Sequence, residues 1–377
     1  MEIAYATEYN SLSVKHWSGS GYYIAQGLKA QGVELDYIGD LSKSREFYLN
    51  LKKLGYMGIS KTFLKDRDIA RAQYLAAQIK QRVQPSADFV FSPGTLPIAY
   101  LESGKPKVFY TDASFAGMID YYPEFSNLCA ETIRDGNLIE QLALDSCSLA
   151  IYSSDWAAQS AIKHYNVPEH KVAIIPFGAN IECTRNINDI KSIVRNRQTN
   201  TCRLLLVGVN WKRKGGDIAM EVAARLNKNG LPTELHIVGM KEIPHKTLPK
   251  YVKSHGFISK STPEGIAALE KLFMESSFLI VPSRFEAFGI VFCEASSFGL
   301  PSLATKTGGI PTAVHDNANG MTFNADADPE QYVRYIQDLF TDRKAYEQLA
   351  LSSFNEYQTR LNWQVNGKLI IERMNAI

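Results

Sequence analysis

The 377-residue chain lacks most features of secreted, metal-binding or membrane-spanning proteins. Its five cysteines are widely spaced and form no Cys-x-x-Cys pair, which argues against a disulfide framework and a zinc site and fits a reducing compartment. Its seven histidines form neither an HxxxH nor an HExxH pattern. No apolar run approaches the roughly 18–20 residues of a membrane span, and the first residues do not resemble a signal peptide. We therefore expect a cytoplasmic protein without a metal centre.

The chain also lacks a large excess of either charge. It has 41 Lys and Arg against 39 Asp and Glu, a balance that argues against nucleic acid as the main partner. With 45% hydrophobic and 21% charged residues it has the composition of an ordinary globular protein, which excludes disordered and collagen-like classes. The length predicts two domains.

Short apolar segments alternate with helical patterns along both halves. In the first half, strands are predicted at 3–6, 33–38, 89–91, 108–110, 149–152 and 172–176, with helices at 22–31, 68–82, 127–147 and 156–165. The polar segment 181–201 interrupts this alternation and is interpreted as a linker. Strands then follow at 204–207, 235–238, 278–281 and 302–304, with helices at 217–227, 266–275 and 290–298 and more from 329 onward. Each half is therefore expected to be a parallel sheet covered by helices.

Ligands of such sheets bind at the loops after the strands, and three loops stand out. The first holds Gly19 and Gly21 and opens a helix at Tyr22. Glycines there allow a backbone to approach a phosphate at a helix N-terminus, although a plain turn explains them equally. A dinucleotide fingerprint would need its third glycine near Ala25.

The second loop, 210–216, places Arg213 and Lys214 beside two glycines at a helix start. Charge-assisted hydrogen bonds and the helix dipole would make it an anion clamp, and a solvated charged loop is the alternative. The third loop follows the apolar strand 278–281 and carries Glu286 and Gly289, with Glu294 in the next helix. Carboxylates suit sugar hydroxyls, and free N–H groups at 288–290 suit phosphate or hydroxyl oxygens. A pair of surface glutamates is the alternative.

These residues carry a resemblance to a known family. The segment PSRFEAFGIVFCEASSFGLPSLATKTGGIP resembles the E-x7-E region of retaining family-4 glycosyltransferases with the GT-B fold. RLLLVGVNWKRKGGDIA resembles the phosphate-binding strand, loop and helix of that family, and IIPFGAN resembles the segment that closes its first domain. The resemblance covers most of 150–325.

The resemblance implies an α/β GT-B fold, with two Rossmann-like domains that face each other across a cleft. We expect an acceptor-side domain at 1–180, the linker at 181–201, a nucleotide-sugar donor domain at 202–358, and a C-terminal helix at 359–377 that returns to the first domain. The implied reaction moves a hexosyl unit from a nucleotide diphosphosugar to an acceptor hydroxyl of a glycan, lipid-linked or small-molecule acceptor, with retention. No cofactor or metal is implied.

The resemblance also implies roles for single residues. Glu294 would bind the donor ribose, Glu286 would face the donor sugar, and Arg213 and Lys214 would hold the diphosphate. The other implied donor contacts are Gly19 and Gly21, the backbone of Phe288, Gly289 and Ile290, and a base site at Phe257 and Ile258.

The chain departs from the family pattern at two places. Many members have Gly-Arg after the phosphate-binding strand, where this chain has Gly208-Val209, so Arg213 would be the substitute. Many also carry a histidine near the sugar, where VFYTDASF offers Asp112 or Thr111 as candidates to orient the donor or acceptor hydroxyl, with Asp112 as the catalytic candidate.

Three other features have mainly structural explanations. Asp326 and Asp328 resemble a metal-binding pair but precede a helix that Asp commonly caps. Cys293 is expected in the core, since it lies next to Glu294 on a helix packed against the sheet, and a thiol nucleophile would need a nearby histidine. His16 precedes the glycine loop and is a candidate to reach the cleft.

The segment 42–82 is unusually basic. It holds ten Lys and Arg against three acidic residues, interleaved with apolar residues. Such a stretch can bind an anionic membrane surface or an acidic acceptor, which would place the protein at the inner membrane face. The alternative is a helix pair whose apolar face packs on its own domain.

For the whole chain, a GT-B epimerase or phosphorylase and a non-catalytic sugar-nucleotide-binding scaffold remain the rival functions.

Overall fold

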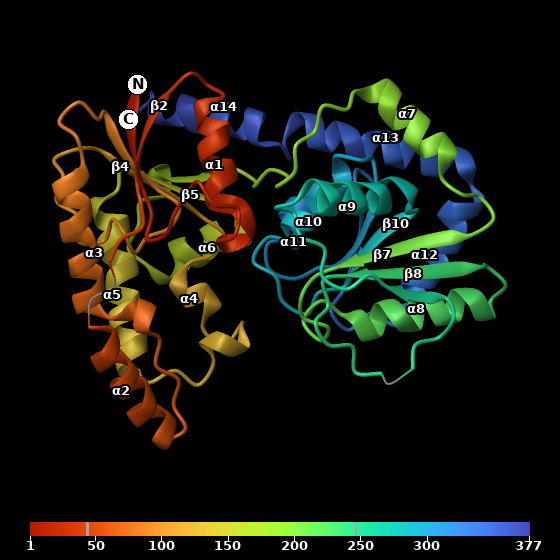
Figure 1. The fold of residues 1–377 in the computed structure, drawn as a ribbon, viewed down its shortest axis with the longest axis horizontal. Helices are drawn as coiled ribbons and strands as arrows, with labels where there is room; N and C mark the ends of the chain where they lie inside the picture. The colour runs from red at the N-terminus through yellow and green to blue at the C-terminus, as the bar shows by residue number, and fades with distance from the viewer. Residues whose placement is uncertain (43–44, 246) are drawn as a thin grey trace. The chain divides into compact units, whose positions relative to one another are not determined.

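The computed structural model describes residues 1–42, 45–245 and 247–377. The chain forms two compact units (Figure 1), the first made of 1–176 and 363–377 and the second of 177–362. No helix in the described part of the chain is long and apolar enough to cross a membrane.

The first unit is built on a parallel six-stranded sheet in the order β2-β1-β3-β4-β5-β6. Strands β3 and β5 are buried along their whole length, as the continuous apolar runs of a sheet covered on both faces require. The strands are β1 (Glu2–Ala6), β2 (Glu34–Ile38), β3 (Phe89–Ser92), β4 (Lys107–Thr111), β5 (Leu149–Tyr152) and β6 (Val172–Ile174).

Three helices of the first unit begin at a capping side chain, namely Asp68, Ser114 or Ser154. The Asp68 carboxylate accepts a hydrogen bond from the Arg71 N–H at 3.1 Å, and this cap starts α3. The helices are α1 (Ser20–Lys29), α2 (Glu46–Gly58), α3 (Ile69–Arg82), α4 (Phe115–Met118), α5 (Ala130–Ser146), α6 (Asp155–His164) and α14 (Trp363–Met374), with short 3-10 turns at Trp17–Gly19, Lys65–Arg67, Pro123–Phe125 and Glu169–Lys171.

The C-terminal helix α14 packs against α1 in the first unit, as the blue and red helices of Figure 1 show. Two glycines make this contact close. A Cβ added to Gly27 would lie 2.6 Å from the carbonyl oxygen of Trp363, and one added to Gly367 would lie 2.1 Å from that of Gly27. The return of the last helix to the first unit therefore depends on residues without side chains.

The second unit is a parallel six-stranded sheet in the order β12-β11-β10-β7-β8-β9. Its strands are β7 (Cys202–Val207), β8 (Thr233–Val238), β9 (Val252–Ser254), β10 (Phe278–Val281), β11 (Ser302–Thr305) and β12 (Gly320–Phe323). Its helices are α7 (Ile187–Asn196), α8 (Gly216–Lys228), α9 (Pro263–Glu275), α10 (Ile290–Ser296), α11 (Ile310–Ala313), α12 (Pro329–Thr341) and α13 (Arg343–Thr359).

The segment 181–201 is not the linker that its polarity suggested, because it contains α7 and belongs to the second unit. Asn186 and Asp189 form a reciprocal capping box at the start of the helix. Only Ile190 and Val194 are buried, one turn apart on a single face. Ile187, Ile190 and Val194 follow the three- and four-residue spacing of one helix face, although they stand among many polar residues.

Each sheet has one pair of neighbouring strands at which the chain order reverses. In the second unit this pair is β7 and β10, from which β8-β9 and β11-β12 extend in opposite directions. In the first unit it is β1 and β3. In open parallel sheets, ligands bind outside the carboxyl ends of strands at such a switch point.

Candidate functional site

The loops that follow β7 and β10 are bound tightly to each other. The backbone N–H of Arg284 donates to the carbonyl oxygen of Arg213 at 2.8 Å. The Arg284 guanidinium donates to the carbonyl of Lys212 at 2.6 Å and to both carboxylate oxygens of Asp217 at 2.9 and 2.6 Å. Arg284 and Asp217 were not among the predicted site residues, since each is ordinary in its own loop and only their contact shows the role.

Gly215 allows the two loops to approach. Its φ of +68° is a left-handed conformation, and a Cβ added there would lie 2.1 Å from the carbonyl oxygen of Pro282. No other residue type meets both conditions without displacing the β10 loop. The glycine predicted to serve phosphate binding thus has a packing function.

The centre of the site is the carboxylate of Glu286. Its Oε2 atom accepts hydrogen bonds from Nη1 of Arg213 at 3.1 Å and from Oγ of Ser283 at 3.4 Å, and it forms an ion pair with Nζ of Lys214. Lys214 is 7% exposed and Glu286 is 9% exposed. The two loops that the sequence predicted separately therefore place a buried carboxylate against two cations at the switch point.

This pairing decides the charge of the carboxylate. Burial alone would raise the pKa of Glu286, but the Lys214 and Arg213 cations outweigh it and hold the pKa below its ordinary value. Burial lowers the pKa of Lys214, and the Glu286 carboxylate acts in the opposite direction. Glu286 is accordingly ionised at neutral pH, and the cations next to it are already arranged to face negative charge.

The backbone at the start of α8 is less available than the sequence suggested. The Gly216 N–H donates to the carbonyl of Trp211 at 2.9 Å, and the Lys214 N–H donates to that of Asn210 at 3.0 Å. These donors are used inside the loop. An anion at this loop would be held mainly by the side chains of Arg213 and Lys214, not by free amides.

The second carboxylate, Glu294, lies in α10 and is only 2% exposed. It forms an ion pair with Nζ of Lys260, which follows β9. Lys260 was not predicted, because a lone lysine in a polar loop carries no sequence signal. The predicted base-site residues Phe257 and Ile258 occupy the same loop, and the Phe257 side chain is 73% exposed.

Phe288, Gly289 and Ile290 connect this loop to α10. The Phe288 side chain is buried and packs edge-on against Phe177, with ring centroids 5.3 Å apart. Gly289 has a φ of +91° and precedes Ile290, the first residue of α10. The Phe288 side chain is thus used in packing, and a ligand contact through its backbone stays a prediction.

The first unit has its own pocket of about 250 Å³ at the ends of β1, β3 and β4. Asp112 lines it together with Glu8, Glu140 and Arg67. Asp112 follows β4, the strand next to the switch pair β1 and β3, and the pocket that it lines also borders the ends of those two strands. Glu8 directly follows the first strand, a position from which the sequence could have indicated it.

The carboxylates of this pocket are partly desolvated. Glu140 is 2% exposed and accepts a hydrogen bond from Oγ1 of Thr95 at 2.8 Å. Burial raises the pKa of Glu140, while Arg67 acts to lower it. Burial also raises the pKa of Glu8, although Arg71 contacts it at 3.2 Å. Such groups suit hydrogen bonds with a hydroxyl-bearing ligand.

The glycine loop packs around Tyr9, which also lines this pocket. A Cβ added to Gly21 would lie 2.4 Å from Oη of Tyr9, and the His16 ring stacks on the Tyr9 ring with centroids 4.9 Å apart. Gly19 has a φ of +88° and precedes α1. Both glycines are thus required by local structure.

Two other sequence expectations have clear outcomes. The Asp328 carboxylate caps α12 by accepting the Glu330 N–H at 2.8 Å, so the capping interpretation is confirmed. Cys293 is buried, burial raises the pKa of its thiol, and it donates to the carbonyl of Phe177 at 3.3 Å, which confirms a core position. Among the described residues, no cluster of His, Cys, Asp or Glu is arranged to hold a metal ion.

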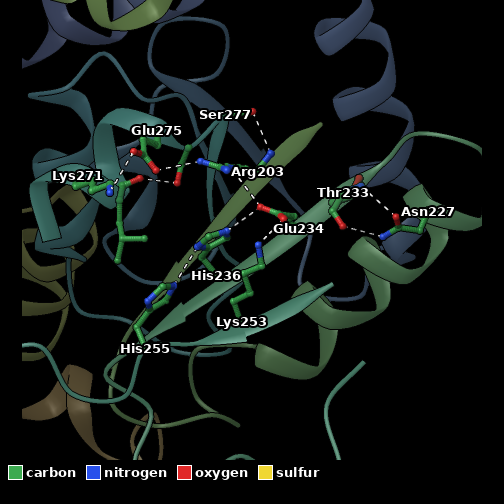
Figure 2. A network of polar contacts seen from close by, with 12 residues as sticks. Arg203, Asn227, Thr233, Glu234, His236, Lys253, His255, Lys271, Glu275 and Ser277 are labelled. Carbon is green, nitrogen blue, oxygen red and sulfur yellow. Dashed lines mark hydrogen bonds and ion pairs between the residues drawn. The ribbon is translucent and has the colours of Figure 1, made fainter. Parts of the chain in front are cut away.

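A separate polar network crosses β7, β8 and β9 (Figure 2). Glu234 accepts hydrogen bonds from Nε of Arg203 at 3.1 Å and from Nε2 of His236 at 3.2 Å, and it pairs with Lys253. Nδ1 of His236 lies 3.0 Å from Nε2 of His255. Partial burial acts to raise the pKa of Glu234, but its cationic and hydrogen-bonding neighbours lower it to about 2. Burial lowers the pKa of both histidines.

Comparisons with known proteins agree with this geometry. Residues 189–353 match the family model described as Glycosyl transferases group 1. The D-inositol 3-phosphate glycosyltransferase of Paenarthrobacter aurescens (strain TC1) is 21% identical over 240 residues, which cover 62% of this chain and 58% of that protein. The enzyme of the same name from Corynebacterium diphtheriae is 22% identical over 242 residues, covering 60% and 55%. The chain thus spans little more than half the length of these curated relatives.

Solved structures resemble the whole chain. Anabaena Alr3699/HepE in complex with UDP and glucose has a TM-score of 0.65 at 14% identity, with full coverage of both chains. Sucrose-phosphate synthase from Thermosynechococcus elongatus has a TM-score of 0.68 at 15% identity, covering 100% of this chain and 98% of that one. The chain therefore has the GT-B fold, with two Rossmann-like domains, and the predicted fold class is confirmed.

Proposed function

We propose that this protein is a glycosyltransferase that moves a hexosyl unit from a nucleotide diphosphosugar to an acceptor hydroxyl, with retention of the anomeric configuration. The observation that carries the proposal is the buried Glu286 carboxylate paired with Arg213 and Lys214 at the switch point between β7 and β10. The match of residues 189–353 to Glycosyl transferases group 1 supports it, because that segment contains both loops.

In the proposed donor complex, the diphosphate oxygens take Arg213 and Lys214 as partners. The two cations then stabilise the negative charge that develops on the leaving group, a role for which they are positioned before the reaction begins. Glu286 remains next to the sugar and hydrogen-bonds its hydroxyls. The remaining proposed donor contacts are Glu294 for the ribose, Phe257 and Ile258 for the base, the backbone of Phe288, Gly289 and Ile290, and Gly19 and Gly21 for the diphosphate.

The proposed chemical step needs no metal ion and no separate general base. The bond between the anomeric carbon and the diphosphate oxygen breaks, and a bond to the acceptor oxygen forms on the same face of the sugar. The acceptor hydroxyl gives its proton to the departing diphosphate. Arg213 and Lys214 hold that diphosphate in place and neutralise it, so that it is retained long enough to accept the proton.

The acceptor is proposed to bind in the pocket of the first unit. Asp112, Glu8 and Glu140 offer carboxylate oxygens there, with Arg67 as the one cation among the residues that line the pocket. Carboxylates accept hydrogen bonds from hydroxyl groups and repel anions. We therefore propose a hydroxyl-rich, uncharged group as the part of the acceptor that enters this pocket, with Asp112 orienting the reacting hydroxyl.

The first experiment is a thermal-shift and hydrolysis screen of UDP-, GDP- and ADP-hexoses, with EDTA and with added Mg²⁺. A ligand that binds only the native state raises its stability, so the correct donor gives a specific increase in melting temperature together with slow release of nucleotide. UDP-glucose is tested first because Alr3699/HepE was crystallised with UDP and glucose. An equal response with EDTA is expected.

The outcome also separates the rival functions. A donor that binds but is neither hydrolysed nor transferred to any acceptor would favour a sugar-nucleotide-binding scaffold. Conversion of the donor to an epimeric sugar nucleotide, or phosphate-dependent release of sugar phosphate, would favour an epimerase or a phosphorylase. No response to any nucleotide sugar, in wild type or in the presence of acceptor mixtures, would overturn the donor site.

A further inference from the structure

Helix α2 is held on the first unit by one face only. Leu49 is 1% exposed and packs with Phe63 and Cys129, and the ring of Tyr56 stacks on that of Phe63 with centroids 5.6 Å apart. On the same side, Lys52 pairs with Glu131. This face accounts for the position of the helix, which lies at one end of the first unit (Figure 1).

The opposite face is apolar and exposed. Phe47, Leu51 and Leu54 are 78%, 52% and 61% exposed, and their spacing of four and three residues places them in one stripe along the helix. Met57 and Ile59, 59% and 67% exposed, continue the apolar surface at the helix end. We call these five residues the α2 stripe. The face that a soluble helix normally fills with polar residues is here the more apolar one.

The outward direction of the stripe is fixed by the structure. The Arg71 guanidinium, itself 5% exposed on its side chain, contacts Glu46 in the first turn of α2 at 2.8 Å and Glu8 at 3.2 Å. The Lys52–Glu131 pair holds the middle of the helix. A rotation that buried the stripe would break both sets of ion pairs. Exposed apolar patches of this kind mark sites of interaction.

The charges around the stripe identify the partner. Between residues 45 and 61 there are four cations and one acid, and the acid, Glu46, is already paired with Lys65 and Arg71. Within the described ranges, no carboxylate lies within ion-pair distance of Arg45, Lys53 or Lys61. Lys61 donates to Oδ1 of Asn127 at 2.8 Å and Arg45 lies over the ring of Tyr48, so these cations have neutral neighbours. Apolar side chains flanked by cations that are not neutralised are the pattern of a helix that lies on an anionic lipid surface.

The structure also shows which cations of the basic segment 42–82 remain available to a partner. Lys65 and Arg71 are neutralised by acids, and Arg67 lines the pocket of the first unit. Lys43 lies outside the described residues. Lys80 pairs with Glu102, and Arg82 donates to the carbonyl of Gly39 at 2.9 Å. Apart from Arg82, the charge that remains for a partner is thus concentrated next to the α2 stripe.

We propose that the α2 stripe docks on the surface of a bilayer that contains anionic lipid, with Arg45, Lys53 and Lys61 facing the headgroups. The stripe enters the boundary between headgroups and acyl chains, while Leu49 and Tyr56 keep the helix attached to the protein. The helix lies on the membrane and does not cross it. This surface is independent of the proposed donor site.

The test is co-sedimentation of the full chain with vesicles. Wild type is expected to bind vesicles of phosphatidylcholine with about one-third phosphatidylglycerol at least roughly tenfold more tightly than pure phosphatidylcholine, since each nearby cation adds attraction to anionic lipid. The double variant Leu51→Ser, Leu54→Ser should lose at least about tenfold of that binding. Ile266→Ser, on the surface of α9 and 39% exposed, is the matched control and should bind as wild type.

A second variant separates the contribution of charge to vesicle binding from that of the apolar contact. Lys53→Gln with Lys61→Gln should reduce the preference for anionic vesicles and make the remaining binding less sensitive to salt. Circular dichroism and the melting temperature should be unchanged in every variant, because all substituted side chains are exposed. Equal binding to neutral and anionic vesicles, absence of binding by wild type, or full binding by the double leucine variant would overturn the proposal. The proposal would also be overturned if the wild type formed a dimer that the double leucine variant converts to a monomer, while vesicles had no effect on either protein.

Discussion

The Nη1 atom of Arg213 lies 3.1 Å from the Oε2 atom of Glu286. The two residues come from loops that follow neighbouring strands, so the contact joins the two halves of the Rossmann-like sheet at its switch point. Without an anionic ligand, Arg213 and Lys214 neutralise a buried carboxylate. In the proposed donor complex, a diphosphate would take over these cations and leave Glu286 to bind sugar hydroxyls.

Replacing Glu286 with glutamine should reduce turnover by roughly 10²–10³-fold, the usual effect of removing one positioned electrostatic group. Glutamine keeps the shape and a hydrogen-bonding oxygen, so the fold should survive. The measurement is the initial rate of nucleotide release with donor and acceptor, beside the melting temperature. Glu264→Gln, an exposed position in the first turn of α9, is the control and should be fully active. A near-wild-type rate for Glu286→Gln would remove this residue from the chemistry.

Replacing Lys214 with methionine should destabilise the second unit by about 3 kcal/mol, because it leaves the buried Glu286 carboxylate with only Arg213 as a cationic partner. Adding Glu286→Gln should recover part of that loss, since the uncompensated charge disappears. Urea denaturation of the two single variants and the double variant measures the coupling. Additive effects would mean that the two side chains do not interact in solution.

Replacing Glu294 with glutamine should weaken donor binding by roughly tenfold or more, the worth of a hydrogen bond to a charged group, with a smaller effect on the rate at saturating donor. Isothermal titration calorimetry gives the comparison. Lys260→Gln removes the ion partner of Glu294 but keeps its carboxylate, so it should weaken binding less. If both variants bind the donor as wild type does, the proposed ribose contact is wrong.

Gly215→Ala should cost about 2–3 kcal/mol more than Gly230→Ala, because the added methyl group has to displace the loop after β10. Both glycines have left-handed backbone, with φ values of +68° and +87°, so both variants carry the same conformational strain. Only at Gly215 does the new Cβ collide, at 2.1 Å from a carbonyl oxygen, whereas nothing lies within 4 Å of Gly230. The free energies of unfolding of the two variants test this difference directly.

Acid should destabilise the second unit through the pair His236 and His255. Folding lowers the pKa of both, so the unfolded chain takes up protons at a higher pH than the folded one. The contribution of the two neutral histidines to the stability of the fold is therefore complete above the ordinary histidine pKa of about 6.5, and it is lost as the pH falls below that value. Folding lowers the pKa of Glu234 from 4.5 to about 2, so a further loss of stability is expected as the pH falls below 4.5.

The measurement is the melting temperature across the range from neutral to mildly acidic pH. His255→Asn should make the decrease of the melting temperature with falling pH less steep. It removes one titrating ring, and with it the repulsion between the two rings when both histidines are protonated. His170→Asn, on an exposed turn of the first unit, should leave the profile unchanged. An identical pH profile for wild type and His255→Asn would rule out this origin of the acid sensitivity.

Local patterns predicted most of the secondary structure. The predicted strands 149–152 and 278–281 have the bounds of β5 and β10, because a continuous apolar run between polar residues leaves little choice of where the strand begins and ends. The predicted helix at 156–165 lies within one residue of α6 at each end, where Ser154 provides the cap. Helix α7 was missed because the polar composition of 181–201 outweighed the helical spacing of Ile187, Ile190 and Val194.

Candidate site residues were predictable where they stand in loops directly after apolar strands. Arg213, Lys214 and Glu286 meet this condition, and the structure brings them together. Lys260 and Glu140 could not be predicted in this way, because their roles come from partners that are 34 and 45 residues away in sequence. Arg284 does follow an apolar strand, but its role depends on Asp217, 67 residues away. A contact of that kind depends on how strands are ordered in the sheet, which no local pattern encodes.

The amino-acid sequence by itself determined the elements of this protein, the loops that carry charge and the absence of long apolar runs, because burial period, caps and glycines act within a few residues. Only the tertiary structure decided that Lys214 and Arg213 share one oxygen of Glu286, that Gly21 makes room for Tyr9, and that the apolar stripe of α2 faces outward. Each of these depends on which surfaces meet after the sheets have formed, and that is settled by packing across distant parts of the chain.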